Sequence, residues 1–491
     1  MNILWIMTDQ LRLDHCGFSG NSYVRTPNID RIAKGAAFTS CQTVNPICMP
    51  ARTALLTGKY PHQIGTLAMS GDLSRQHPTL PRALQHAGYY TASIGKLHYL
   101  QTWNWSTPKN QGLDLVALSA EIQQYGYDYV WETAGKQLSR QNLCQHTAAL
   151  RSDNLLDAYY DFVDAAGPND DTIHGNWNEN FDGSPWPFAP EKHVDIMTAE
   201  QTIAVINRLP SDRKFFVHAS FCSPHKPFDP PPEYLDPIPL EVRDVIAGPD
   251  KLTENEIARL AQHWRAYRAL VKLLDDQIGR IIQALEDRGL ADDTAIVFSS
   301  DHGEMMGDHG RTQKTIYYKE ALTVPLAIYH PHYVGGISAD TPVEAIDITA
   351  TVAEIAGIDF RKALTKDWPA FHDRLPCRSL MPIVRGEQDR IRDFSFSECG
   401  GQWYAIQDDQ YKYVRWLQYE QPGSYREELY DLVDDPDELI DLMRHAPASD
   451  HIRSVLQLMR DRRDYVLDST PPAQTRWAPI RGEHYDPVTD S

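Results

Sequence analysis

Polar side chains follow four short apolar segments of this sequence, at the point where each segment ends. They comprise two carboxylates, an amide, three imidazoles and a lysine: Asp9, Gln10, Lys96, His98, His225, Asp301 and His302. Carboxylate, amide and imidazole donors together suit a hard or borderline divalent cation such as Ca²⁺ or Mn²⁺. We therefore predict a cation site built from Asp9, Gln10, Asp301 and His302. The alternative for any one of them alone is a cap on the following helix or turn.

Basic side chains near such a cation would hold an anion that already touches it. Arg52, Lys96 and Lys314 are the candidates for this fixed positive charge. His98 and His225 are candidate proton donors, because imidazole titrates near neutral pH. The alternative for His225 is simple packing under the proline-rich stretch "PHKPFDPPPEY". The segment "DHGEMMGDHG" contains two Asp-His-Gly triplets, and we expect the first, which directly follows a strand, to bind the cation.

A cysteine begins a predicted helix within the stretch "NPICMPARTALLTG", residues 45–58. A thiol at a helix N-terminus has a lowered pKa, so Cys48 could be a nucleophile. No partner pattern of a thiol protease accompanies it, and a lone thiolate suits an oxygen-ligated cation poorly. The residues alone leave the role of Cys48 open between a buried thiol, a nucleophile, a metal ligand and the starting material for another chemical group.

The elements that must position these groups alternate between helices and apolar strands. The strands are "NILWIMTD", "YYTASIGK", "KFFVHASF" and "TAIVFSS", and a long helix is expected within residues 253–289. This alternation predicts an α/β fold with a mostly parallel central sheet sandwiched by helices. In such sheets the site lies beyond the carboxyl ends of the strands, which is where the candidate residues fall.

Changes of pattern along the chain predict two domains. Residues 1–374 form a catalytic α/β domain, in which residues 101–190 are an insertion over the edge of the site. Residues 375–491 form a smaller C-terminal α+β domain with an antiparallel sheet, a helix near residues 448–465 and an extended tail. Five tryptophans in the insertion would form its own core or, alternatively, line a substrate pocket: Trp103, Trp105, Trp131, Trp177 and Trp186.

Composition excludes several classes of protein. The net charge of −20, from 67 acidic and 47 basic residues, argues against binding to nucleic acid or to an anionic membrane. The seven cysteines lack the spacing of a disulfide framework or a zinc site. The first segment has no basic region and no cleavage site typical of a signal peptide, so we expect a cytoplasmic protein. A periplasmic protein whose leader had been removed would have the same sequence features.

Four segments resemble the signatures of one family. "CMPARTALLTG" is similar to the Cys-x-Pro-x-Arg signature of the sulfatases, and "GYYTASIGKLH" is similar to their second signature. "SSDHGEMMGDHG" and "ELYDLVDDPDE" resemble their second metal segment and their C-terminal strand and turn. The resemblance covers nearly the whole chain in the same order, with residues 101–190 least covered. It implies an alkaline-phosphatase-like fold and the hydrolysis of sulfate esters.

The resemblance also implies a nucleophile. In sulfatases a separate maturation enzyme oxidises this cysteine to formylglycine (3-oxoalanine), so Cys48 would become a hydrated aldehyde. One hydroxyl, on the metal, would attack sulfur or phosphorus and displace the alcohol. The other would collapse the hemiacetal and expel sulfate, assisted by His98. Arg52 and Lys96 would hold the gem-diol, and His225 and Lys314 would grip the substrate or protonate the leaving oxygen. The implied metal positions are Asp9, Gln10, Cys48, Asp301 and His302.

The sequence departs from the common sulfatase pattern at Met49, Leu97, Gln10 and His302. The last two resemble the choline sulfatase and phosphonate monoester hydrolase branch, and they make Mn²⁺ a rival to Ca²⁺. Hydrolysis of a phosphonate monoester or phosphodiester is therefore the alternative function. A third hypothesis is a metal-binding relative without turnover, whose Cys48 stays a thiol. The substrate would be a small anionic ester of an aryl, choline or glycan alcohol, and the extended tail is consistent with a homo-oligomer.

Overall fold

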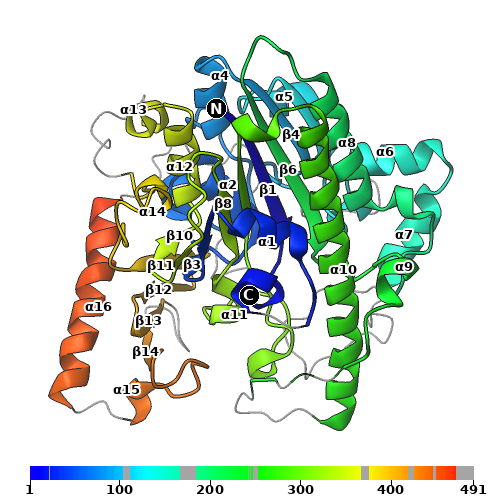
Figure 1. Cartoon of the computed structure of the whole chain (residues 1–491). Coiled ribbons are helices and arrows are strands. Elements are labelled where there is room, and N and C mark those ends of the chain that lie inside the picture. The colour runs from blue at the N-terminus through cyan, green and yellow to red at the C-terminus, as the bar shows by residue number, and fades with distance from the viewer. Residues whose placement is uncertain are drawn as a thin grey trace.

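The computed structural model describes residues 1–20, 23–102, 111–165, 184–241, 243, 245–246, 253–365, 375–417, 425–445 and 449–470 (Figure 1). The predicted C-terminal tail from residue 471 lies outside these residues, as do Trp103, Trp105 and Trp177. The strands are β1 Asn2–Asp9, β2 Ala36–Phe38, β3 Cys41–Gln42, β4 Tyr90–Lys96, β5 Tyr129–Thr133, β6 Phe215–Pro224, β7 Thr294–Ser300, β8 Leu326–Tyr329, β9 Ile337–Ala339, β10 Val343–Glu344, β11 Ser395–Cys399, β12 Trp403–Gln407, β13 Tyr411–Trp416 and β14 Arg426–Asp431.

The helices of the described residues range from one turn to 34 residues in length. They are α1 Pro27–Ala33, α2 Cys48–Thr57, α3 Pro61–Ile64, α4 Leu80–His86, α5 Ser119–Gln123, α6 Gln145–Ser152, α7 Leu156–Ala165, α8 Val194–Arg208, α9 Pro232–Leu235, α10 Glu254–Asp287, α11 Lys319–Leu322, α12 Asp347–Ile355, α13 Phe360–Leu364, α14 Met381–Val384, α15 Leu442–His445 and α16 Asp450–Ser469. The longest, α10, begins at a capping box in which Thr253 and Glu256 satisfy each other's backbone N–H groups.

The central sheet has eight strands in the order β5-β4-β6-β1-β7-β8-β2-β9. Its pairs are parallel except those made by β8, which runs antiparallel to both β7 and β2. The fold-class prediction of a mostly parallel sheet between helices is therefore confirmed.

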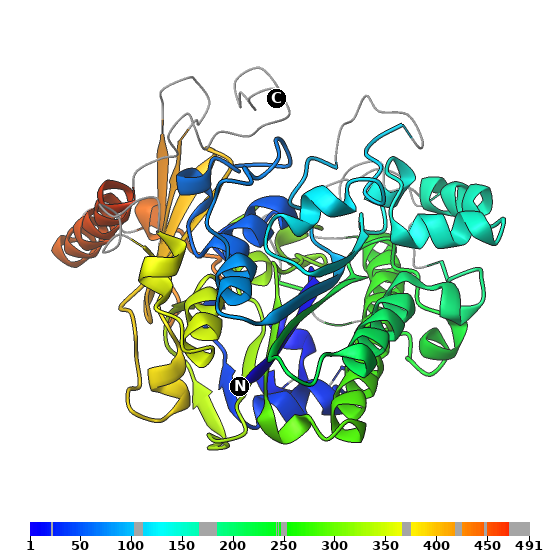
Figure 2. The same ribbon diagram turned by 90° about the horizontal axis from the view of Figure 1, so that it is seen from above.

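Both faces of this sheet are buried, as the unbroken apolar run of β1 predicts. Leu4 and Ile6 pack with α1, α8 and α10 on one face, and Ile3, Trp5 and Met7 pack with α2, α4 and α12 on the other. Figure 2 shows the sheet between these two sets of helices. Because both faces of the sheet are covered by apolar side chains, polar side chains can gather at the carboxyl ends of the strands.

Residues 101–190 are more than an insertion over the edge of the site. Within them β5 pairs in parallel with β4 and forms the edge strand of the central sheet. Its sequence "YVWET" is short and contains a charged residue, so it does not stand out as a buried strand. Trp131 lies on β5 in the main core, whereas Trp186 packs with α7 in a separate small core.

The C-terminal part forms the expected antiparallel sheet, in the order β11-β12-β13-β14, with α16 packed against it (Figure 1). Residues 380–384 still pack in the core of the central sheet, so the second sheet begins only at Ser395. Among the described residues, no helix is both long and apolar enough to cross a bilayer.

Candidate active site

Four adjacent parallel strands bring the predicted site residues to one edge of the sheet. In the order β4-β6-β1-β7, the strands end at Lys96, just before His225, at Asp9 and just before Asp301. The register pairs Asp9 with Pro224 and Thr8 with Ser300, so the carboxylates of Asp9 and Asp301 start from neighbouring positions. The sequence prediction that strand ends converge is therefore correct for these groups.

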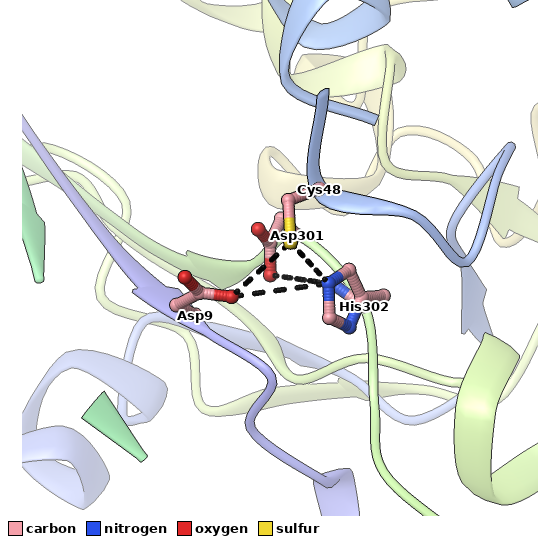
Figure 3. A group of neighbouring side chains, drawn as sticks. All are labelled: Asp9, Cys48, Asp301 and His302. Atoms are coloured by element: carbon pink, nitrogen blue, oxygen red, sulfur yellow. Dashed lines mark hydrogen bonds and ion pairs between the residues drawn. The ribbon is translucent and has the colours of Figure 1, made fainter. Parts of the chain in front are cut away.

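Asp9, Cys48, Asp301 and His302 form a compact buried cluster, in which one donor atom from each lies within 4.8 Å of the others. Figure 3 shows the four side chains pointing toward a common centre from β1, from the start of α2 and from the segment after β7. Cys48 Sγ lies 3.2 Å from His302 Nε2 and 3.8 Å from Asp9 Oδ1. The structure thus places the thiol among the predicted cation ligands.

Cys48 is the first residue of α2, a helix that is buried along its whole length. The Asn45 side chain accepts a hydrogen bond of 2.9 Å from the Ile47 amide and shapes the turn into the helix. Burial alone would raise the pKa of the thiol, but Lys314, Lys96 and His302 hold that pKa well below its ordinary value. The position therefore favours a negatively charged or strongly polarised group.

Arg52 lies one turn after Cys48 on the same helix and is fully buried. Its Nε donates to Asp301 Oδ2 at 2.7 Å, and its Nη1 donates to the Lys96 carbonyl at 2.6 Å and to Ser220 Oγ at 2.8 Å. These bonds leave the guanidinium one fixed orientation. Sequence reasoning missed Ser220, whose only signal is a small polar residue inside the apolar strand β6.

The Lys96 ammonium lies 2.5 Å from Asp9 Oδ2, and both side chains are buried. Burial would raise the pKa of Asp9, but the neighbouring cations, Lys96 foremost, outweigh it and lower that pKa. Burial would likewise lower the pKa of Lys96, and the Asp9 charge raises it instead. The two groups are therefore both charged at neutral pH.

Gln10 has a left-handed backbone (φ 70°) that turns its side chain toward the loop carrying Lys314. Its Nε2 donates to the Glu304 carboxylate, and its Oε1 accepts from Lys314 Nζ at 2.5 Å. Lys314 Nζ also lies 3.6 Å from Cys48 Sγ, so the amide oxygen borders the cluster. Glu304, which the sequence analysis did not single out, fixes which end of the amide faces the site.

The first of the two Asp-His-Gly triplets is the one in the cluster. His302 Nδ1 donates to the Gly303 carbonyl at 3.0 Å, which directs Nε2 at the other donors. In the second triplet, Asp308 pairs with Arg12 at 2.8 Å and with Arg243, and His309 stacks on Tyr318. The second triplet is therefore used for packing and ion pairing.

The donor set fits a divalent cation. Ligand atoms on opposite sides of a Ca²⁺ ion lie about 4.6–5.2 Å apart, so four donor atoms that all lie within 4.8 Å of one another can share one ion. Although burial opposes it, the Asp301 carboxylate raises the pKa of His302, and a cation bound through Nε2 would compete with a proton for that nitrogen.

Both histidines predicted as proton carriers are buried near Cys48. His225 Nδ1 donates to the Lys226 carbonyl at 2.8 Å, which leaves Nε2 to exchange a proton. Burial and the Lys314 charge lower the pKa of His225. Burial lowers the pKa of His98 to about 4, and neither ring nitrogen has a hydrogen-bond partner within the part of the chain that the structure describes. His98 is therefore neutral at neutral pH.

Glu132 on β5 is a buried carboxyl beside this site that predicts a measurable pH effect. Its Oε1 accepts from the His98 amide at 3.4 Å, and burial raises its pKa to about 8. In the unfolded chain the carboxyl ionises near pH 4.5. Between pH 4.5 and pH 8 the wild-type protein therefore takes up a proton when it folds, and its folded state loses stability as the pH rises. We expect Glu132→Gln, which mimics the protonated form, to stabilise the protein at pH 8 by up to about 4 kcal/mol, but not at pH 4. Denaturant unfolding at both pH values tests this, and an equal difference at both would contradict it.

Comparison with known proteins places the chain in a family. Residues 1–358 match the sulfatase family, and residues 307–464 match the family described as N-sulphoglucosamine sulphohydrolase, C-terminal. The chain is 28% identical to an arylsulfatase of Clostridium perfringens, with 93% of each chain covered. It is 26% identical to a choline-sulfatase of Rhizobium meliloti, with 94% of this chain and 86% of that one covered.

A solved phosphonate monoester hydrolase of Agrobacterium radiobacter shares the fold, with a TM-score of 0.70 at 23% identity and coverage of 95% of this chain and 96% of that one. The chain belongs to the sulfatase family. It is accordingly a sulfuric ester hydrolase, and the resemblance seen in its sequence motifs is confirmed.

Proposed function

We propose that the protein hydrolyses sulfate esters at the cluster around Cys48, after this cysteine has been oxidised to formylglycine by a maturation enzyme. The observation that carries the proposal is the position of Cys48 Sγ, 3.2 Å from His302 Nε2 and 3.6 Å from Lys314 Nζ. A hydroxyl of the hydrated aldehyde at this position would serve as the nucleophile. Sulfate and an alcohol are the products.

The residues around Cys48 supply charge for an anionic ester. Lys96 and Arg52 are held rigidly by Asp9 and Asp301, so they need not reorganise during the reaction. They hold the oxidised Cys48 side chain in one orientation. Lys314 faces the same point from another loop and grips a sulfate oxygen of the substrate.

Two histidines move protons. Because His225 Nδ1 donates its hydrogen to a backbone carbonyl, Nε2 is the nitrogen that can take up the proton released by the attacking hydroxyl and pass it to the leaving oxygen. His98 is neutral at neutral pH and can accept a proton from the oxidised Cys48 side chain when sulfate leaves. Neither ring nitrogen is engaged by another described residue, so the one that carries no hydrogen is free to accept this proton.

One divalent cation would be held by Asp9, Gln10, Asp301 and His302, with the oxidised Cys48 side chain beside it. When bound, such a cation polarises a sulfate oxygen and favours the ionised form of a nearby hydroxyl. The set pairs two carboxylates with two neutral donors, which suits Ca²⁺ and also leaves Mn²⁺ as an alternative.

Hydrolysis of phosphonate monoesters or phosphodiesters is the second candidate. Sulfate esters, phosphonate monoesters and phosphodiesters all carry a single negative charge, so the three cations Arg52, Lys96 and Lys314 do not separate them by charge. The neutral donors Gln10 and His302 keep the site less anionic than one built from carboxylates, which favours acceptance of either anion.

The two functions are distinguished by comparing nitrophenyl sulfate with nitrophenyl phenylphosphonate on the matured enzyme, in Ca²⁺ and in Mn²⁺. We expect kcat/KM for the sulfate to exceed that for the phosphonate by about tenfold or more, which corresponds to about 1.4 kcal/mol of differential transition-state binding. A preference for the phosphonate in both metals would make the second candidate the primary function.

A further inference from the structure

Lys314 lies in a loop whose backbone is strained on both sides of it. Gln313 has φ 70° and Thr315 has φ 79°, and a left-handed conformation is costly for a β-branched residue such as threonine. Such a conformation persists only when the surroundings hold it in place. The position of the Lys314 ammonium, 2.5 Å from Gln10 Oε1, therefore depends on what fixes this loop.

One side of the loop is fixed by the central domain. The Gln313 amide donates to the Glu304 carboxylate, and the Met305 amide donates to the Gln313 carbonyl at 2.7 Å. Glu304 also accepts from Gln10 Nε2, so one carboxylate holds both Gln10, which contacts the Lys314 ammonium, and Gln313, which precedes Lys314 in the chain.

The other side is fixed by the C-terminal sheet, through a bond at every second residue. On β12, Trp403 Nε1 donates to the Thr315 carbonyl at 3.2 Å. On β13, the ammonium of Lys412 donates to the Tyr317 carbonyl at 3.1 Å. In the turn segment that follows β14, Glu438 accepts from the Lys319 amide at 2.7 Å.

These bonds come from the interior of the protein. The side chains of Trp403, Lys412 and Glu438 are almost fully buried, and Lys412 Nζ forms an ion pair of 2.6 Å with Glu438. The hydroxyl of Tyr317 contacts Tyr430 at 3.1 Å and donates to Glu428 on β14. The segment 315–319 is thus anchored to the second sheet through both its backbone and its one fully buried ring.

We propose that the C-terminal sheet is part of the catalytic apparatus, because its Trp403 indole and Lys412 ammonium position Lys314. The inference rests on the proposed function of Lys314 as the group that grips the substrate. Trp403 and Lys412 are positioning residues, since neither touches the cluster around Cys48 directly. Because the segment 315–319 is bonded to the rigid sheet and directly follows Lys314, it restricts the positions that the Lys314 ammonium can adopt.

A double-mutant cycle on the matured enzyme tests the proposal. Trp403→Phe keeps a large ring in the core but removes the N–H that binds the Thr315 carbonyl. We expect it to lower kcat/KM for nitrophenyl sulfate about tenfold, because a small displacement of a charged group costs transition-state binding. In the background of Lys314→Met, the same substitution should change kcat/KM by less than about twofold.

Two further variants keep the result interpretable. Trp5→Phe removes an equally buried indole N–H whose partner, Ser299 Oγ at 2.9 Å, lies within the central sheet, and it should leave kcat/KM within about twofold of wild type. Tyr317→Phe serves if Trp403→Phe does not fold. It removes only a hydroxyl, and Glu428 keeps its bonds from Trp416 and Tyr430. It should show the same dependence on Lys314.

Equal losses from Trp403→Phe in both backgrounds would overturn the proposal, as would wild-type kinetics in the folded variant. If Lys314→Met itself has wild-type kinetics, then both the proposed binding of the substrate by Lys314 and its positioning by the C-terminal sheet are wrong. If Lys314→Met is impaired and Trp403→Phe is not, only the positioning by the C-terminal sheet is wrong, and the proposed function stands.

Discussion

Replacing Cys48 with alanine is expected to lower kcat/KM for sulfate esters by about 10⁴-fold or more. The variant lacks the side chain that would become the nucleophile, and the described cluster of Asp9, Cys48, Asp301 and His302 contains no other thiol. The fold should survive, because alanine is a good helix former and Cys48 caps no backbone group of α2. The comparison is of initial rates on nitrophenyl sulfate for both proteins after expression with a maturation enzyme.

A matched control for this experiment is Cys222→Ala. Cys222 is equally buried on β6, near the site but outside the cluster, and burial raises its pKa. Its removal should cost stability through lost packing while kcat/KM stays within about tenfold of wild type. Retention of activity by Cys48→Ala would show that hydrolysis does not depend on this side chain.

Asp301→Asn is expected to lose both cation binding and stability. Asp301 Oδ2 accepts from Arg52 Nε at 2.7 Å, and Oδ1 accepts from the amides of Gln10 and His302 at 3.0 and 2.9 Å. Asparagine keeps one acceptor oxygen but replaces the other with an NH2 group, so this NH2 must face at least one of the three N–H groups. We expect destabilisation of about 3–5 kcal/mol, since the buried Arg52 loses its charged partner.

The affinity of this variant for Ca²⁺ or Mn²⁺ should fall by more than about 100-fold, as measured by isothermal titration calorimetry. Asp308→Asn, in the second Asp-His-Gly triplet, is the matched control, because Asp308 pairs with Arg12 and Arg243 away from the cluster. It should lose stability and keep its cation affinity. A similar loss of affinity in both variants would mean that the effect reflects general destabilisation, not ligation.

The sequence predicted the parallel core and the convergence of the site because both follow from local patterns. An apolar run such as β1 specifies a strand buried on both faces, and Asp9 at its end then falls on the carboxyl edge of the sheet. Asp301 and His302 follow β7 in the same way, so their approach to Asp9 required only that β1 and β7 be neighbours.

Features that depend on tertiary contacts could not be predicted. Strand β5 is short and carries Glu132, so only its pairing with β4 identifies it as part of the sheet. Ser220 looks like any small polar residue until Arg52 is seen to bind it. The bond from Trp403 to Thr315 joins a residue of the C-terminal sheet to a loop residue 88 positions earlier, and no periodicity in the chain indicates it.

The most direct test of the central claim relates sulfate-ester hydrolysis to the oxidation state of Cys48. The protein would be expressed with graded amounts of a formylglycine-generating enzyme, and mass spectrometry of the peptide containing Cys48 would give the converted fraction of each sample. The proposed function predicts that specific activity on nitrophenyl sulfate rises in proportion to that fraction and vanishes when only thiol is present. Activity that is independent of the converted fraction would contradict it.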